Sequence, residues 1–574
     1  MFILKNNWKR LEKMRWMQRL IALGLCVVMA AALTACKSEE TFNWSQLSDV
    51  SASPTPAPST ESQALTVSMP SASGELDPFT NPSQGMQGLM KLCYEGLLRL
   101  GDRYQPENWL ADSVTRTEEG YTVTLRAGVL FHDGKGLTAA DVVYSFNAIR
   151  QAEDSPWKDV IAPIEEIRAD GERVLNVKTG AGYAALYALT FPVVNKDTGG
   201  DFYAGTGPYC VEGYVKGESL ELIRWESWWR TPARIPAIHA MAREDAESVL
   251  NTFVTGSLDV CAVDMLTVSS VTQRSYVHKQ EYLTGQAELL LPNLSGRLGD
   301  AQLRQVIALA LDGKDVIANT YQNHGVSVDV PVLPDSWLSE RAGGVEHDAD
   351  AARALLEQLG WKDLDGDGCV ERYASGLGAE EEPQEDGLTG DAAHNDAVNA
   401  LLGGTQENPA DKTTERLMLT ILTNEEDASR HKDAAGRIAS QLNAVGIHTT
   451  VEAVSFDKLD DAVQAGGWDL LLCGYQLPDT GSLASLLATD GGNNRMGYSS
   501  AEMDAALAQM DAALTAESYY AAMQRVYDLI VRDLPVYTVC MRTRTQVTAE
   551  SVTVPGVIRE SEPYRGIESW THIE

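Results

Sequence analysis

Apolar and polar residues alternate along residues 121–129, which is the pattern of a β-strand with one buried face. Residues 131–134, Phe-His-Asp-Gly, predict a turn after this strand, because Asp and Gly tolerate left-handed backbone conformations. Thr138 is followed three residues later by Asp141, and this spacing has the form of a capping box. We therefore expect a helix that runs through residues 142–146.

The second half of the chain repeats this alternation of strand and helix. An apolar run at residues 417–422 predicts a buried strand, and a helical pattern follows around Ile438. Another helical pattern covers residues 351–359. Strands that alternate with helices predict an α/β fold.

The first 35 residues are typical of an export signal. Six basic residues precede an uncharged apolar stretch at residues 20–35. That stretch is short for a membrane span, which needs about 20 residues, and it fits the apolar part of a signal peptide. Small residues followed by Cys36 resemble the lipobox of bacterial lipoproteins, which implies diacylglycerol on Cys36 and cleavage before it. An uncleaved anchor with a chance cysteine is the alternative, and translation starting at Met14 or Met17 stays open.

Residues 36–63 read as a disordered tether. They are rich in Ser, Thr, Pro and acidic residues, with a proline-rich run at residues 53–58. Such a segment buries too little apolar surface to fold, and proline makes it an extended spacer. The apolar run at residues 64–67 opens the globular part.

The globular part is too long for one ordinary core, so we expect two or more lobes. The chain has a formal charge of −35, and the first 36 residues carry six basic residues and one acidic residue. The mature chain is therefore close to −40. This acidity argues against nucleic acid as a partner and against direct adsorption on anionic lipid.

The cysteines leave two interpretations open. They have no C-x-x-C spacing, which argues against a zinc knuckle or a thioredoxin-like site. Six cysteines allow 15 pairings, so the sequence does not choose between disulfides and buried thiols. The six residues, beyond Cys26 in the signal and Cys36, are Cys93, Cys210, Cys261, Cys369, Cys473 and Cys540.

No catalytic or cofactor motif emerges. H-E-x-x-H and G-x-S-x-G are absent, and residues 128–136 lack the spacing of a phosphate loop. Residues 363–368, Asp-Leu-Asp-Gly-Asp-Gly, begin like a calcium loop, but the twelfth position is Ala374 where a bidentate glutamate is expected. We interpret them as a polar turn. The sequence predicts neither an enzyme nor a metal or cofactor site.

A series of short segments carries the family resemblance. In chain order they are Tyr94-Glu95-Gly96-Leu97, Leu110-Ala111-Asp112-Ser113, residues 121–146 with the elements above, Gly205-Thr206-Gly207-Pro208-Tyr209, Trp228-Trp229, residues 256–260, residues 303–312, residues 351–356, residues 441–447 and Leu534-Pro535-Val536-Tyr537. This order closely resembles the family 5 extracellular solute-binding proteins, which are the dipeptide, oligopeptide and nickel receptors of ABC importers. The resemblance covers residues 65–557.

The resemblance implies a periplasmic-binding-protein-like α/β fold of the class II type, with two hinged lobes and an additional α/β lobe. The expected division is a signal peptide at 1–35, a tether at 36–63, lobe I at 64–92, 205–282 and 533–574, the extra lobe at 93–204, and lobe II at 283–532. Within lobe II, residues 376–411 hold nine acidic residues and no basic residue, and read as an exposed acidic insertion.

The implied function is capture of a small solute, a peptide by preference, for an ABC transporter permease. The protein would be a monomer, held by its lipid on the outer face of the cytoplasmic membrane or on the periplasmic side. Two alternatives stay open: a receptor of the same fold for a sugar, an opine-like compound or a metal chelate, and a secreted enzyme.

The resemblance also suggests ligand-binding residues. Peptide receptors of this family hold the ligand's amino terminus with an aspartate shortly after an aromatic residue. Tyr475 matches the aromatic residue, but Pro478 stands where the aspartate is expected and Asp479 lies one place later. A loop cap is the alternative role for Asp479, and a core role is the alternative for the tryptophans. The other candidates are Ser71, Ala72, Tyr94, Glu95, Thr206, Gly207, Trp228, Trp229, Asn493 and Arg495, of which Arg495 could pair with a ligand carboxylate.

Overall fold

An eleven-stranded mixed sheet runs through the part of the chain that the computed structural model describes. The described residues are 62–263, 271, 277–339, 343–373, 414–426 and 430–573. The main path has the order β17-β16-β18-β12-β19-β11-β1-β10-β9-β8, and β13 pairs with β19 beside it. These strands are β1 (Leu65–Pro70), β8 (Tyr209–Val215), β9 (Ser219–Arg224), β10 (Ala237–Arg243), β11 (Val260–Val263), β12 (Val277–Pro292), β13 (Gly325–Val326), β16 (Met418–Asn424), β17 (His448–Val454), β18 (Leu470–Gln476) and β19 (Tyr537–Ala549).

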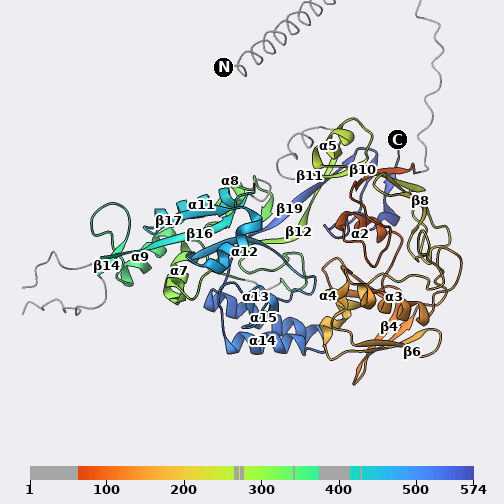
Figure 1. Ribbon diagram of the computed structural model, residues 1–574, viewed down its shortest axis with the longest axis horizontal. Helices are drawn as coiled ribbons and strands as arrows, with labels where there is room; N and C mark the ends of the chain where they lie inside the picture. Colours follow the sequence, from red (N-terminus) through yellow and green to blue (C-terminus); the bar gives the residue numbers. More distant parts are fainter. Residues whose placement is uncertain are drawn as a thin grey trace, which may run out of the picture. The chain divides into compact units, whose positions relative to one another are not determined.

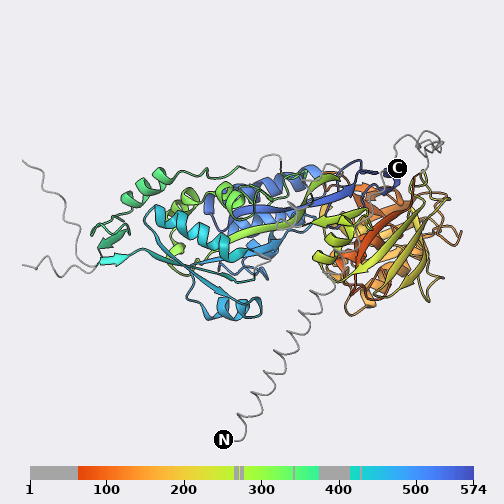
Figure 2. The same ribbon diagram turned by 90° about the horizontal axis from the view of Figure 1, so that it is seen from above.

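Two long antiparallel strands, β12 and β19, connect the two halves of this sheet (Figure 1, Figure 2). Their register shifts between Leu283 and Ala287, where Gly285 has a φ of +78° that favours glycine. β12 crosses the boundary that the sequence predicts between lobe I and lobe II at residues 282 and 283. This bulged crossing is where the chain can bend between the halves.

Helices cover the half of the sheet that holds β16, β17 and β18. Two hydrophobic cores lie on opposite faces of these strands. One contains side chains of α7, α9 and α11, and the other contains side chains of α13, α14 and α15. The helices here are α7 (Ala301–Ala310), α8 (Gly313–Asn319), α9 (Ala349–Gln358), α11 (His431–Ala444), α12 (Phe456–Ala465), α13 (Ala484–Leu487), α14 (Ala501–Asp511) and α15 (Ala516–Asp533), with the short η3 (Arg297–Gly299).

The other half combines β1 and its neighbours with a separate four-stranded sheet of order β4-β5-β7-β6. One continuous core joins both. Its elements are α2 (Gln84–Met90), β4 (Ala111–Arg116), β5 (Gly120–Leu125), α3 (Ala139–Gln151), α4 (Lys158–Ile161), β6 (Glu166–Ala169), β7 (Val174–Lys178), η2 (Tyr183–Thr190) and α5 (Ala246–Val254). The described residues also form three two-stranded sheets: β2 (Leu98–Leu100) with β3 (Pro106–Asn108), β14 (Glu371–Tyr373) with β15 (Thr414–Arg416), and β20 (Val552–Thr553) with β21 (Thr571–His572). The short 3-10 helix η5 (Ile567–Ser569) lies just before β21.

The local predictions are confirmed where residues are described. The amide of Thr138 donates to Asp141 Oδ2 at 3.0 Å at the start of α3, as a capping box requires. Gly134 closes its turn with φ +82°, and its amide donates to the carbonyl of Phe131 at 2.8 Å. The strand and helix predicted around residues 417–422 and Ile438 are β16 and α11. The α/β fold of the expected type is therefore present.

The structure does not test the other predictions. Cys36, the signal, nearly all of the tether and the acidic insertion at 376–411 lie outside the described residues. The division into three lobes stays a prediction, since residues Ser59–Glu574 form one compact unit. The six cysteines of that unit are free thiols. Among the helices of the described residues, none has the length and apolar character to cross a membrane.

Candidate ligand-binding cavity

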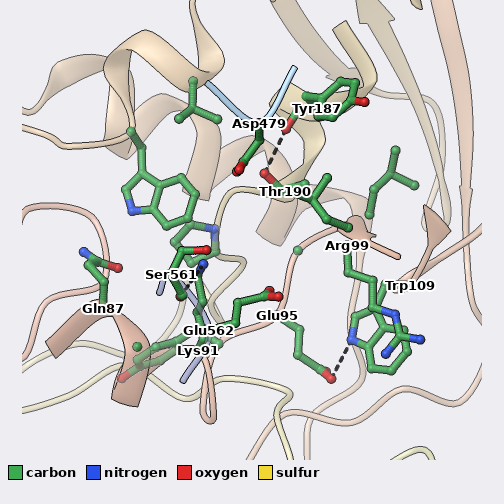
Figure 3. A pocket seen from close by; sticks show the side chains of 18 of the residues that line it. Gln87, Lys91, Glu95, Arg99, Trp109, Tyr187, Thr190, Asp479, Ser561 and Glu562 are labelled. Atoms are coloured by element: carbon green, nitrogen blue, oxygen red, sulfur yellow. Dashed lines mark hydrogen bonds between the residues drawn. The ribbon is translucent and has the colours of Figure 1, made fainter. Parts of the chain in front are cut away.

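A cavity of about 860 Å³ opens between elements from both halves of the molecule (Figure 3). This volume lies within the usual range of small-ligand sites. Its walls come from α2, from the β2–β3 region and η2, from the loop after β18, and from the C-terminal segment around Glu562. Segments far apart in the sequence therefore meet at one site.

Glu95 anchors one wall of this cavity. Its Oε1 accepts hydrogen bonds from the indole Nε1 of Trp109 at 2.8 Å and of Trp228 at 3.3 Å. Its Oε2 accepts from Trp229 Nε1 at 3.0 Å and from Thr206 Oγ1 at 2.8 Å. All four lone-pair positions of one carboxylate are thus used, by donors from three separate segments of the chain. We call these five residues the Glu95 cage.

The Glu95 cage holds a carboxyl group away from water. Burial raises the pKa of Glu95 to about 7, although the four hydrogen bonds favour the charged form. Guanidinium groups stack on the outer faces of the indoles: Arg99 lies 3.8 Å from the centre of the Trp109 ring and Arg126 lies 5.1 Å from that of Trp229. The cage therefore fixes the position of Trp109 and, through stacking, that of Arg99.

Two acidic residues, Asp479 and Glu562, lie within the electrostatic influence of Lys91 elsewhere in the cavity. The ammonium group of Lys91 donates to the carbonyl of Ser561 at 3.0 Å, and Figure 3 shows Lys91, Ser561 and Glu562 grouped together, with Asp479 apart from them beside Tyr187 and Thr190. Solvent reaches Asp479 inside the cavity, but protein surrounds it, and this burial raises its pKa despite the charge of Lys91. Burial opposes ionisation of Glu562 as well, yet Lys91, Arg565 and Arg559 together hold the pKa of Glu562 below its usual value.

The other charged feature of the cavity is a pair of arginines, Arg99 and Arg565. Arg565 binds Glu562 at 2.8 Å and Asp102 at 2.9 Å. Arg99 Nε is buried and has no hydrogen-bond partner, and its pKa is lowered by burial and then by the charge of Arg565. Arg99 also forms an ion pair with Glu107 at 3.6 Å. The cavity thus offers carboxylates in one part and, in another, a guanidinium whose ion pair is long.

Direct contacts close the cavity between the two halves. Trp337 Nε1 donates to the hydroxyl of Tyr187 at 3.1 Å, and its ring stacks on Tyr519 with the centres 6.1 Å apart. The backbone amides of Gly182 and Tyr183 donate to carbonyls of residues 511 and 513 at 2.9 and 2.5 Å. These contacts join η2 to α14 and the loop after it, so the two halves of the molecule touch directly beside the cavity.

Six of the residues predicted from the sequence come together here. Tyr94, Glu95, Trp228 and Asp479 line the cavity, and Thr206 and Trp229 are one hydrogen bond behind its wall. Gly207 supports the same wall: a Cβ there would lie 2.3 Å from the carbonyl oxygen of Leu92, so only glycine fits.

The remaining predicted residues lie elsewhere, and their role in binding stays a prediction. Ser71 and Ala72 are exposed at the end of β1, outside the cavity lining. Tyr475 is half-buried in β18, while Asn493 donates to Ser485 Oγ at 2.9 Å. Arg495 pairs with Asp460 at 3.2 Å on the surface, so it does not face the cavity.

Sequence reasoning missed seven charged residues of the lining: Lys91, Arg99, Asp159, Asp511, Glu562, Arg565 and Glu568. Lys91 and Arg99 flank the segment Tyr94–Leu97 that carried the resemblance. The concentration of charged residues at 559–565 was the available signal for Glu562 and Arg565.

Comparison with known proteins gives a consistent result. The family model described as bacterial extracellular solute-binding proteins, family 5 Middle, matches residues 105–495. The oligopeptide-binding protein AppA of Bacillus subtilis (strain 168) is 20% identical over 549 residues, which cover 90% of this chain and 92% of AppA. The dipeptide-binding protein DppE of the same organism is 21% identical over 601 residues, covering 96% and 98%.

A solved structure supports the same fold. That of a nickel ABC transporter protein from Bacillus halodurans superimposes with a TM-score of 0.71 at 17% identity, covering 89% of this chain and all of the other. With the family model matched over more than half of its length, the chain belongs to the bacterial extracellular solute-binding proteins of family 5.

Proposed function

We propose that this protein captures peptides outside the cytoplasm and delivers them to the permease of an ABC importer. The observation that carries the proposal is the carboxylate of Asp479, which lines the cavity. Glu562 is paired with Arg565 at 2.8 Å, whereas the Asp479 carboxylate has no hydrogen bond or ion pair with any described residue, so a cationic group on the ligand would supply its partner. The amino terminus of a peptide is such a group.

The arginine pair suits the other end of the same ligand. A peptide carboxylate could accept from the guanidinium of Arg99, whose Nε has no hydrogen-bond partner. The names of AppA and DppE, an oligopeptide-binding and a dipeptide-binding protein, point to the same class of ligand. The described lining contains neither histidine nor cysteine, which disfavours a bare transition-metal ion.

The anchoring at Cys36 belongs to this proposal. Two acyl chains and a proline-rich spacer would keep the receptor beside its permease on the outer face of the membrane and raise its local concentration there. The receptor would act as a monomer and would need no cofactor, and the proposal assigns it capture of the solute and no catalysis.

A thermal-melting screen tests the proposal. The chain from Ser59 onward forms one compact unit, so this segment is purified and melted with peptides of two to nine residues. A peptide present at about 100 times its Kd should stabilise the protein by about 2.7 kcal/mol. Failure of every peptide to raise the melting temperature would refute peptide capture.

Two variants locate the binding group. Asp479→Asn keeps the size of the side chain and should abolish the shift, because the ammonium group loses its charged partner. Asp461→Asn on the exposed side of α12, outside the cavity lining, is the matched control and should keep it. Binding that survives in Asp479→Asn would favour a non-peptide solute.

A further inference from the structure

The loop between α9 and β14, whose place in the fold Figure 1 shows, and the start of β14 carry four acidic residues. Asp363, Asp365 and Asp367 alternate along the loop, and Glu371 follows as the first residue of β14. Carboxylate oxygens of Asp363, Asp365 and Glu371 lie within 4.8 Å of one another. The fold therefore gathers into one place groups that span nine positions of the sequence.

Glu371 supplies a second and independent observation. Its side chain is only 4% exposed, which is unusual for a glutamate at the edge of a loop. Oε2 accepts the backbone amide of Leu364 at 3.0 Å, whereas Oε1 is buried and accepts no well-formed hydrogen bond, its charge being met only by the Nε of Arg416 at 3.1 Å. Burial of a carboxylate oxygen without a well-formed hydrogen bond is costly, and a carboxylate oxygen of Glu371 lies within 4.8 Å of those of Asp363 and Asp365.

The charge around Glu371 is only partly balanced. The guanidinium of Arg416 lies 2.8 Å from Asp365, 2.5 Å from Asp367 and 3.1 Å from Glu371 Oε1. One positive charge thus faces four carboxylates, which leaves a formal excess of three negative charges. A divalent cation would neutralise more of this charge than Arg416 does.

The ligand atoms identify the kind of cation. The cluster offers carboxylate oxygens, which hard cations prefer. The only sulfur in the loop, that of Cys369, is buried in the protein, and its thiol donates to the carbonyl of Val370 at 3.9 Å. Positive φ angles at Gly366 and Gly368, +83° and +87°, give the tight turn that a calcium loop needs at these positions.

We propose that Asp363, Asp365, Asp367 and Glu371 bind a calcium ion, and that Arg416 moves away from Glu371 as the ion enters. The glutamate that closes the loop is then at the ninth position, not at the twelfth, where the sequence has Ala374. The ion would tie the loop after α9 to β14. Extracellular calcium sites commonly have a Kd of about 10⁻⁴–10⁻³ M, which we expect here.

Calorimetric titration tests this site. The chain from Ser59, freed of metal with EDTA, should bind one calcium ion per molecule and melt at a higher temperature in about 5 mM calcium. Glu371→Gln should weaken calcium binding at least tenfold. Asp365→Asn, at a side chain that is half exposed, should do the same and serves if Glu371→Gln does not fold.

Two more variants sharpen the test. Arg416→Gln should bind calcium more tightly, because a competing positive charge is removed. Asp350→Asn on α9, whose carboxylate is 95% exposed, is the matched control and should bind as the parent does. Absence of binding at about 10 mM calcium, an unchanged affinity in both Glu371→Gln and Asp365→Asn, or an equal response to magnesium would overturn the proposal.

Discussion

The Glu95 cage should make the stability of this protein depend on pH in a way that one substitution removes. Glu95 is buried among Trp109, Trp228, Trp229 and Thr206, and burial raises its pKa from 4.5 to about 7. The folded state therefore binds a proton more tightly than the unfolded chain does. The contribution of Glu95 to stability is fully present below pH 4.5 and is lost as the pH rises through about 7.

The magnitude follows from the two pKa values of Glu95. A shift of this size corresponds to about 3 kcal/mol in total, of which about 2–3 kcal/mol falls between about pH 5 and about pH 8. The glutamine in Glu95→Gln does not titrate, so this variant should not lose that stability as the pH rises. At low pH it should be less stable than the parent by about 1–3 kcal/mol, because an amide has one acceptor oxygen and leaves a buried donor such as Trp229 without a partner.

Urea unfolding of the parent and of Glu95→Gln, at about pH 5 and at about pH 8, measures how much stability each protein loses between these two pH values. The pH dependence of the parent minus that of Glu95→Gln isolates Glu95 from other titrating groups, such as His132, whose pKa burial lowers to about 4. His132 acts with the opposite sign, since its buried neutral form gains stability as the pH rises. An identical pH dependence of the parent and Glu95→Gln would refute the reasoning.

Three further predictions follow from the cavity. Asp479→Asn should raise the urea midpoint of the ligand-free chain while it removes peptide binding, because the protein around Asp479 disfavours its charge until a ligand neutralises it; a lower midpoint would contradict this. Trp337→Ala should weaken peptide binding by about 1–3 kcal/mol, since the hydrogen bond from its indole to Tyr187 in the other half is lost, and small-angle scattering should show a more open molecule; an unchanged scattering profile would argue against it. Gly207→Ala should destabilise the chain by about 1–3 kcal/mol in urea unfolding, because its Cβ would collide with the carbonyl of Leu92, and a neutral effect would contradict the close packing.

Local patterns predicted much of the fold. The strand β5, the capping box at Thr138 and the pair β16 and α11 depend on neighbours within a few residues, so periodicity and cap chemistry reveal them. Their assembly into one sheet across β12 and β19 depends on pairing between residues more than 250 positions apart. The family resemblance supplied that arrangement, which the patterns alone did not.

The candidate site was predictable only in part, for the same reason. Glu95 was found through the segment that surrounds it, but two of its tryptophan partners are 133 and 134 residues away. Lys91 and Ser561, which are in contact, are 470 residues apart in the sequence, so no local pattern predicts their contact. At the acidic loop, counting to the twelfth position missed Glu371, because its burial beside the loop depends on the position of β14.

The central claim is that the acidic group at Asp479 captures the amino terminus of a peptide. Calorimetry with one peptide in two forms, free and N-acetylated, tests it most directly. The free form should bind the parent at least tenfold more tightly than the acetylated form, and Asp479→Asn should remove this difference. Equal binding of both forms to the parent, or no binding of either, would contradict the claim.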